Sequence, residues 1–348
     1  MLTRRHLATG LSASLAATLP LALTPGRSWG SETPLGAPGQ TLPDSSRPSP
    51  PNGLPNEPTD LSTLIQGGLD LQERLTIPVM IGDQGPFEFA VDTGADRSCL
   101  SDQLAAKLAL PAGPNVMVHG ISGSALTPTV LMPGLTIGEE TLKGGVVPIL
   151  ARGRLGVDGL LGVDALQNRR LVMNFRDRIL ELRQPNLSDG YEPTPKSALV
   201  PARNRQGLLT VAGAKADNVP VEAFVDSGGA LSVGNMALAT ALGRRASRWD
   251  PFAPQVRMVD VTGEEAIGEV HVVRVLKFGT MRFTDMGLVF CDLHVFDRWG
   301  MGDKPAVLLG ANALKLFSRI EMDYGRKRIY FQMAADPMIW LADNAVLG

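Results

Sequence analysis

Short apolar runs follow one another from about Leu61 onward, and turns rich in glycine and proline separate them. Several runs alternate apolar with polar residues, which is the period of a half-buried strand. Helical spacing occurs in Ser101–Leu110, through Leu104 and Leu108, and in the shorter segment Gly234–Leu242. The pattern therefore predicts an all-β protein with short helices.

An internal duplication organises the predicted strands. The chain matches itself without a gap at an offset of 134 residues, so that Arg74–Ile77 lies over Leu208–Val211 and Pro86–Ala95 lies over Pro220–Gly229. A repeat of this length indicates two copies of one folding unit. In each half an apolar strand ends in an Asp-(Thr/Ser)-Gly triplet, and these triplets are Asp92-Thr93-Gly94 and Asp226-Ser227-Gly228.

The order of elements after each triplet is also repeated. Each half contains a predicted hairpin with a glycine in its tip, and the tips are Gly120-Ile121-Ser122-Gly123 and Val261-Thr262-Gly263. Each half then has an apolar strand that runs into a glycine, over 159–166 and 307–314, before a last pair of strands over 171–182 and 319–331. Two lobes of similar topology, related by a pseudo-twofold axis, are therefore predicted. The second lobe has an insertion over 244–254, which we expect to be a surface loop.

Four segments make up the predicted domain organisation. Residues 1–30 are an export signal, 31–58 a disordered linker rich in Pro, Ser and Gly, 59–193 the N-terminal lobe and 194–348 the C-terminal lobe. The linker lacks apolar periodicity, so it has no apolar face to bury. We place the boundary between the lobes between Arg183 and Ser197, where proline, asparagine and glycine interrupt the strand pattern.

The first 30 residues have the features of a targeting segment. Arg4 and Arg5 precede an apolar stretch from Leu7 to Leu23, and this order resembles a bacterial twin-arginine signal. It predicts export to the periplasm or the medium. An ordinary secretory signal and an uncleaved membrane anchor are the alternatives, although the 17 residues of the stretch fall short of the ~20 needed to span a bilayer.

Composition narrows the classes of function. Among 348 residues, 33 Lys and Arg against 35 Asp and Glu give a net charge of −2, which provides no field for a nucleic-acid backbone. The two Cys and four His have none of the spacings typical of metal ligands. We therefore expect no nucleic acid, no metal and no organic cofactor.

The two triplets predict a pair of carboxylates. A pseudo-twofold axis would bring Asp92 and Asp226 face to face, and two carboxylates about 3 Å apart cannot both ionise readily. Such a pair holds one proton, so one member can take a proton from a bound water while the other donates to a peptide carbonyl. Which of the two Asp residues is protonated stays open at this point.

The residues that follow each Asp suit this role. Thr93 and Ser227 offer short hydroxyls that can bond to backbone across the axis, and Gly94 and Gly228 let the chain turn tightly beneath the carboxylates. These residues predict two loops locked together at the axis.

With both triplets, both strands that run into glycine and the shared order of elements, the chain over roughly 70 to 335 resembles the aspartic proteases of the retropepsin-like type, with both halves in one polypeptide. The resemblance implies a two-lobed all-β fold, a monomer with an internal pseudo-dimer, and a peptide or protein substrate. It implies that Asp92 and Asp226 are catalytic, that the hairpin tips are flaps over the substrate, and that the supporting loops are formed by Thr93, Gly94, Ala95, Ser227, Gly228 and Gly229.

Two departures from the pepsin-like pattern carry predictions. Ala95 and Gly229 stand where those enzymes have a Ser or Thr that bonds to the carboxylate, so the pKa values of the pair should rise and activity should be best in weakly acidic to neutral conditions. Neither hairpin tip contains a tyrosine and both contain glycine, so we expect two mobile flaps.

Other candidate groups receive plainer interpretations. Asp158 and Asp164 have Ala306 and Asn312 as their equivalents, so we expect surface or capping roles. His119, His271 and His294 are expected in core or surface positions, and Cys99 and Cys291 are expected as buried free thiols rather than a disulfide.

The main alternative function is a catalytically silent protein that binds peptides in the same groove. Intact carboxylates, glycines and hydroxyls in both triplets favour catalysis. A membrane-tethered protease that cleaves one partner differs from our main hypothesis only at the N-terminus.

Overall fold

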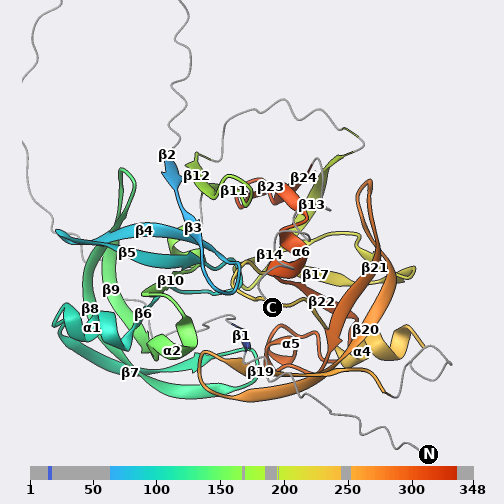
Figure 1. Ribbon diagram of the computed structural model, residues 1–348, viewed down its shortest axis with the longest axis horizontal. Coiled ribbons are helices and arrows are strands. Elements are labelled where there is room, and N and C mark those ends of the chain that lie inside the picture. Colours follow the sequence, from blue (N-terminus) through green and yellow to red (C-terminus); the bar gives the residue numbers. More distant parts are fainter. Residues whose placement is uncertain are drawn as a thin grey trace, which may run out of the picture.

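The computed structural model describes residues 15–17, 63–166, 169–184, 194, 196–243 and 252–334. Strands predominate in these ranges, and no helix there is longer than six residues. The strands form two lobes joined by a shared sheet (Figure 1). The predicted all-β, two-lobed fold is confirmed.

The first lobe is an eight-stranded sheet in the order β3-β4-β5-β10-β6-β9-β8-β7. Strand β10 lies between β5, to which it is parallel, and β6, to which it is antiparallel. This arrangement buries β10 at the centre of the lobe and lets β5 end beside it. The strands are β3 (Gly68–Leu69), β4 (Leu75–Ile81), β5 (Gln84–Val91), β6 (Cys99–Ser101), β7 (Ala112–His119), β8 (Ser124–Ile137), β9 (Glu140–Leu150) and β10 (Gly159–Leu161).

The second lobe repeats this topology. Its order is β19-β20-β21-β18-β22-β17-β14, and β22 lies between the parallel β17 and the antiparallel β18, as β10 does between β5 and β6. The strands are β14 (Leu208–Val211), β17 (Glu222–Val225), β18 (Val233–Gly234), β19 (Gln255–Asp260), β20 (Glu265–Phe278), β21 (Met281–Phe290) and β22 (Ala306–Leu309), with β15 (Lys215–Ala216) and β16 (Val219–Pro220) at one side.

The helices are shorter than the sequence pattern suggests. Helix α1 spans Asp102–Lys107 and α4 spans Met236–Ala241, and each begins after a side chain that accepts the backbone N–H of the third helical residue. Those caps are Ser101 and Asn235, whose oxygens accept from Leu104 N and Leu238 N. The two helices therefore occupy equivalent places in the two lobes.

The strand expected over 159–166 ends early, because the chain turns after Gly162 into helix α3 (Val163–Leu166). A Cβ on Gly162 would lie 2.4 Å from the Arg97 carbonyl carbon, so the chain passes directly against the loop that follows the first triplet. Val163 N then donates to Ala95 O at 2.8 Å instead of continuing the ladder. Helix α6 (Ala311–Leu314) makes the same turn after Gly310 in the second lobe.

A six-stranded antiparallel sheet, at the top of Figure 1, joins the lobes in the order β2-β12-β11-β23-β24-β13. The order is symmetric, because each lobe contributes its first strand and its last two. The strands are β2 (Thr63–Gln66), β11 (Arg170–Asn174), β12 (Ile179–Arg183), β13 (Ser197–Arg205), β23 (Phe317–Asp323) and β24 (Arg328–Met333).

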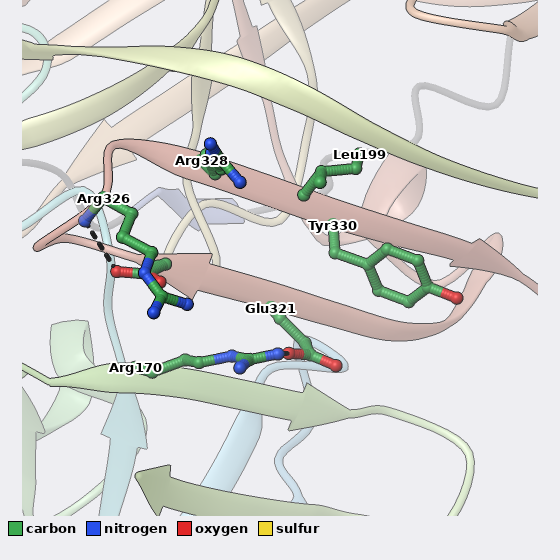
Figure 2. Close-up of a pocket in the computed structure, with 7 residues that line it drawn as sticks. Arg170, Leu199, Glu321, Arg326, Arg328 and Tyr330 are labelled. Atoms are coloured by element: carbon green, nitrogen blue, oxygen red, sulfur yellow. Dashed lines mark hydrogen bonds and ion pairs between the residues drawn. The ribbon is translucent and has the colours of Figure 1, made fainter. Parts of the chain in front are cut away.

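The pseudo-twofold axis crosses this sheet between β11 and β23. Val172 lies directly opposite Glu321, and the two occupy the same position in the two repeats. Glu321 is 2% exposed and binds two equivalent arginines, Arg170 from the first lobe and Arg319 from the second. Figure 2 shows the Arg170 guanidinium pointing at the Glu321 carboxylate beside a small pocket of about 40 Å³. A pocket of this size has room for a water or two.

The segments at the edges of the described ranges complete the fold. Residues Leu15–Ala17, within the predicted export signal, form strand β1, which pairs in parallel with Met258–Asp260. Among the described residues, no helix is long and apolar enough to cross a membrane. The linker over 31–58, the lobe boundary over 185–193 and most of the insertion over 244–254 lie outside the described residues, so their predictions stay predictions.

Candidate active site

Asp92 and Asp226 lie at the ends of β5 and β17, where the two lobes meet. Each backbone N–H donates to the last residue of the central strand of its lobe, Asp92 to Leu161 O and Asp226 to Leu309 O, both at 3.0 Å. Both side chains are fully buried. The symmetric placement of the two strands therefore brings the predicted pair of carboxylates together.

Four hydrogen bonds cross the axis between the triplets. Thr93 Oγ1 donates to Val225 O at 2.9 Å and accepts from Ser227 N at 3.1 Å. Ser227 Oγ donates to Val91 O at 2.7 Å and accepts from Thr93 N at 3.1 Å. Each hydroxyl is thus fully used, and the two triplet loops are fixed to each other as the sequence predicts.

Backbone N–H groups hold the outer oxygen of each carboxylate. Asp92 Oδ1 accepts from Gly94 N at 2.9 Å and from Ala95 N at 3.0 Å, and Asp226 Oδ1 accepts from Gly228 N at 3.0 Å. The Oδ2 atoms of both residues are buried, and apart from the carboxyl group of the other Asp they have no hydrogen-bond donor among the described residues. Both carboxylates therefore keep one oxygen available for a further ligand.

The loop glycines fit closely around these groups. A Cβ on Gly228 would lie 2.2 Å from Asp92 Cγ, and a Cβ on Gly229 would lie 2.6 Å from Asp226 Oδ2. Any larger residue at either position would displace a carboxylate. Gly228 is needed here for its lack of a side chain, because the opposite carboxyl group occupies that space.

Burial is the main cause of the perturbed acidity of the pair. It raises the pKa of Asp92 to about 6, against the lowering effects of the Gly94 N–H and of the Arg74 charge. The pKa of Asp226 lies well above its usual range because of burial and then because of the Asp92 charge beside it. The pair therefore keeps a proton up to a higher pH than two ordinary Asp side chains would, and the two residues titrate as one coupled unit.

Arg74 is a charged group of the first lobe that acts on Asp92. Its side chain is fully buried, and it donates from Nε to Asp70 Oδ2 at 2.7 Å and from Nη2 to Leu155 O. Its charge lowers the pKa of Asp92. The equivalent position in the second repeat is Leu208, so the second lobe has no charge at this place in the fold.

The tips of the two predicted flaps meet each other. Ser122 N and Gly123 N, in the tip between β7 and β8, donate to the carboxylate of Asp260 at the end of β19. The apolar tip residues Ile121 and Val261 are both buried. Figure 1 shows the two hairpins converging at the bottom of the view, on the opposite side of the molecule from the six-stranded sheet.

Three contributions at this interface were not found from the sequence. Asp260 precedes the predicted tip of the second hairpin, and Arg74 is equivalent to Leu208 in the repeat. Each is a charged residue in one repeat with an uncharged equivalent in the other. That difference between the repeats was the available signal. His119 and His294 were treated separately, but their rings stack with Nδ1 and Nε2 3.1 Å apart, which no sequence spacing indicates.

The plainer predictions agree with the structure where it describes them. Asp158 accepts from Glu88 N, and the exposed Asp164 accepts from Ser98 N and Oγ. Cys99 and Cys291 are both free and buried, and burial raises the pKa of Cys291 to about 11.

In the described ranges no cluster of His, Cys, Asp or Glu side chains could hold a metal ion. The expectation that the protein needs no metal stays a prediction.

A known protein family matches a segment in each of the two lobes. The aspartyl protease family model matches residues 77–165 and 211–313, which together make up more than half of the chain and include both triplets. The chain therefore belongs to the aspartyl protease family. No curated protein matches the chain.

Two solved structures show similar features at low identity. A retropepsin-like aspartic protease from Rickettsia conorii is 19% identical with a TM-score of 0.27, and the match covers 35% of this chain and 90% of that one. Basic 7S globulin from soybean is 9% identical with a TM-score of 0.42, and the match covers 79% of this chain and 97% of that one.

The bonds across the axis give a first prediction. Thr93→Val keeps the shape of the side chain but leaves Ser227 N and Val225 O without partners in a buried site, so it should lower the free energy of unfolding by about 2–4 kcal/mol. Thr93→Ser keeps the hydroxyl and should cost about 1 kcal/mol through the lost methyl group. Urea unfolding of both variants measures the difference, and equal losses would contradict the assigned role of the hydroxyl.

The buried pair gives a second prediction, for stability against pH. An unfolded Asp has a pKa near 3.9, whereas Asp226 is raised well above that in the fold, so between these values the folded state holds a proton that the unfolded state has lost. Stability therefore falls as pH rises through this window. Asp226→Asn removes this titrating group and should become increasingly more stable than the wild type as the pH is raised from about 4 to about 8.

Thermal or urea unfolding of the wild type and of Asp226→Asn across this range is the measurement. Other buried acids contribute equally to both proteins, so the difference between the two curves isolates the pair. Parallel curves would show that Asp226 ionises as easily in the fold as in the unfolded chain.

Proposed function

We propose that this protein is an aspartic endopeptidase that hydrolyses peptide bonds with a water activated between Asp92 and Asp226. The observation that carries the proposal is the pair of buried carboxylates at the axis, each with an Oδ2 atom that has no donor among the described residues apart from the other carboxyl group. A buried acceptor without a partner is costly unless a ligand or water satisfies it. A water between the two carboxyl groups would do so.

Within this proposal we assign the role of base to Asp92, because the buried Arg74 charge favours its ionised form. Asp92, ionised near neutral pH, takes a proton from the water as its oxygen bonds to the peptide carbonyl carbon. Asp226, which holds a proton, transfers it to the carbonyl oxygen and so neutralises the charge that would develop there. The product of this step is a gem-diol, with the proton now on Asp92.

Breakdown of the gem-diol reverses these roles. Asp92 gives its proton to the peptide nitrogen as the C–N bond breaks, and Asp226 takes a proton from one gem-diol hydroxyl. An amine and a carboxylic acid leave, and the pair again holds one proton on Asp226. No covalent bond to the protein forms, because the water is the nucleophile, so the step requires no Ser or Cys nucleophile.

Burial of the pair supports the pH range expected from the sequence. Burial raises the pKa of Asp92 to about 6, while Ala95 contributes a backbone N–H that lowers it. Activity should therefore require pH near or above 6 on its acid side. It should fall again once Asp226 loses its proton.

The N-terminal pattern supports a further part of the proposal. Arg4 and Arg5 ahead of the apolar stretch favour export, so that the enzyme would act on peptides or proteins outside the cytoplasm. It would act as a monomer, because the two lobes of one chain already supply both carboxylates.

Cleavage of a mixed peptide library by the full chain, between about pH 3 and 8, tests the mechanism. Asp92→Asn should lower kcat by at least about 10³-fold because the base is lost, and a statine-type transition-state mimic should block the wild type. Asp217→Asn is a matched control, since Asp217 also accepts a backbone N–H, from Val275 at 2.8 Å, but lies outside the pair.

The outcomes separate the alternatives. A pH profile with its maximum below about pH 3 would contradict the assigned acidities. A folded protein that binds the mimic but cleaves nothing at any pH would overturn catalysis and favour a silent peptide-binding protein.

The role of Arg74 gives a separate prediction. Replacing its charge, as in Arg74→Met with Asp70→Asn to avoid an unpaired carboxylate, should raise the pKa of Asp92 and shift the acid limb of the kcat profile upward by about one pH unit. Arg74→Lys keeps the charge and should shift it little. An unchanged acid limb in the double variant would show that Arg74 has no part in setting the roles of the pair.

A further inference from the structure

Asp260 binds both hairpin tips with one carboxylate. Oδ2 accepts from Ser122 N at 2.9 Å and from Gly123 N at 3.3 Å, both in the tip of the first lobe. Oδ1 accepts from its own tip, from Thr262 N at 2.8 Å, Gly263 N at 3.0 Å and Glu264 N at 3.1 Å, and from the Thr262 hydroxyl at 2.5 Å. Asp260 is fully buried in this position.

The first tip is shaped to receive this carboxylate. A Cβ on Gly120 would lie 2.2 Å from Asp260 Oδ2 and 2.6 Å from its Cγ. Gly120 does not have a positive φ, so the backbone there does not itself require glycine. Its lack of a side chain makes room for the Asp260 carboxylate.

Gly120 and Asp260 are equivalent residues, since Gly120-Ile121-Ser122-Gly123 and Asp260-Val261-Thr262-Gly263 occupy the same place in the two repeats. Two Asp residues here would repel each other, and two Gly residues would leave the N–H groups of Ser122 and Gly123 without this acceptor. One Asp opposite one Gly is the arrangement that pairs the tips, and it requires two lobes with different sequences.

Each tip is also bound to the opposite lobe. Ile121 O accepts from Val295 N at 3.2 Å in helix α5 (His294–Arg298) of the second lobe. Thr262 O accepts from Arg154 Nη1 at 2.8 Å in helix α2 (Arg152–Leu155) of the first lobe. The tips therefore cross, and Asp260 lies where they meet.

We propose that Asp260 is a positioning residue that latches the two flaps together in the closed state, with Gly120 as its receptor. The proposal rests on the proposed function, because closed flaps would hold a peptide against Asp92 and Asp226. Entry of a substrate would require the bonds from Ser122 and Gly123 to Asp260 Oδ2 to break, and closure would restore them. The two flaps would thus open by separation of their tips.

A double-mutant cycle on the full chain tests the latch. Asp260→Ala removes the carboxylate, whereas Gly120→Ala leaves the turn of the second hairpin intact and displaces the carboxylate by steric contact. Gly145→Ala is the matched control, because Gly145 lies in β9 with an ordinary φ and no atom within 4 Å of an added Cβ. The first readout is amide hydrogen exchange at Ser122 and Gly123, measured by NMR.

We expect each single variant to speed exchange at these two amides by at least about tenfold, and the double variant to be no faster than Asp260→Ala. The control should exchange at the wild-type rate. With a peptide substrate, the same variants should raise KM more than they lower kcat, because the closed state that holds the peptide is weakened.

Wild-type exchange at Ser122 and Gly123 in Asp260→Ala would overturn the proposal, and so would an effect of Gly120→Ala that persists in the absence of Asp260. The exchange experiment needs no turnover. Faster exchange in a protein that cleaves no peptide would therefore support the latch while refuting the proposed catalysis.

Discussion

The burial of two carboxyl groups at one axis is the constraint on which the rest of this structure depends. Like charges in a buried site repel, so Asp92 and Asp226 stay together only because the surrounding backbone holds them there. The hydroxyls of Thr93 and Ser227 tie the two loops across the axis, and N–H groups bind the outer oxygens. The strands β10 and β22 fix where each loop begins. Because both carboxyl groups cannot readily ionise in this buried site, the pair shares one proton. The proposed reaction uses that proton.

Fusion of the two halves allows this symmetric framework to carry asymmetric charges. Three positions near the interface have a charged residue in one repeat and an uncharged equivalent in the other. The charged residues are Arg74, Asp260 and Glu321, and their equivalents are Leu208, Gly120 and Val172. In a symmetric dimer each of these charges would occur twice, and so would its partners. Two copies of Glu321 facing each other across β11 and β23, or two copies of Asp260 at the tips, would place like charges in contact. One copy of each is instead satisfied by groups from both lobes.

The sequence predicted the framework because the framework is periodic. Alternating strands, the repeat and the two triplets indicated the two-lobed all-β fold and the pairing of Asp92 with Asp226, and the helical spacing in Ser101–Leu110 indicated helix α1. It could not predict where strands end against neighbours, so the strand expected over 159–166 stops at Leu161, where the chain bonds to the loop behind the triplet. Contacts such as His119 with His294 depend on the distance between lobes in space, which no local pattern records.

The residues that the sequence pattern did not indicate share one property: each lies where the two repeats differ. A repeat comparison favours positions that match, because matched positions define the fold. The residues that distinguish the two carboxylates and join the two tips are the positions that do not match. Only a difference between the lobes can make the surroundings of the two carboxylates unequal, or place an acceptor opposite donors. Arg74 and Asp260 were both visible in the alignment as charges without an equivalent. In a fused pseudo-dimer, departures from symmetry near the axis therefore carry information about mechanism that the repeated triplets alone do not.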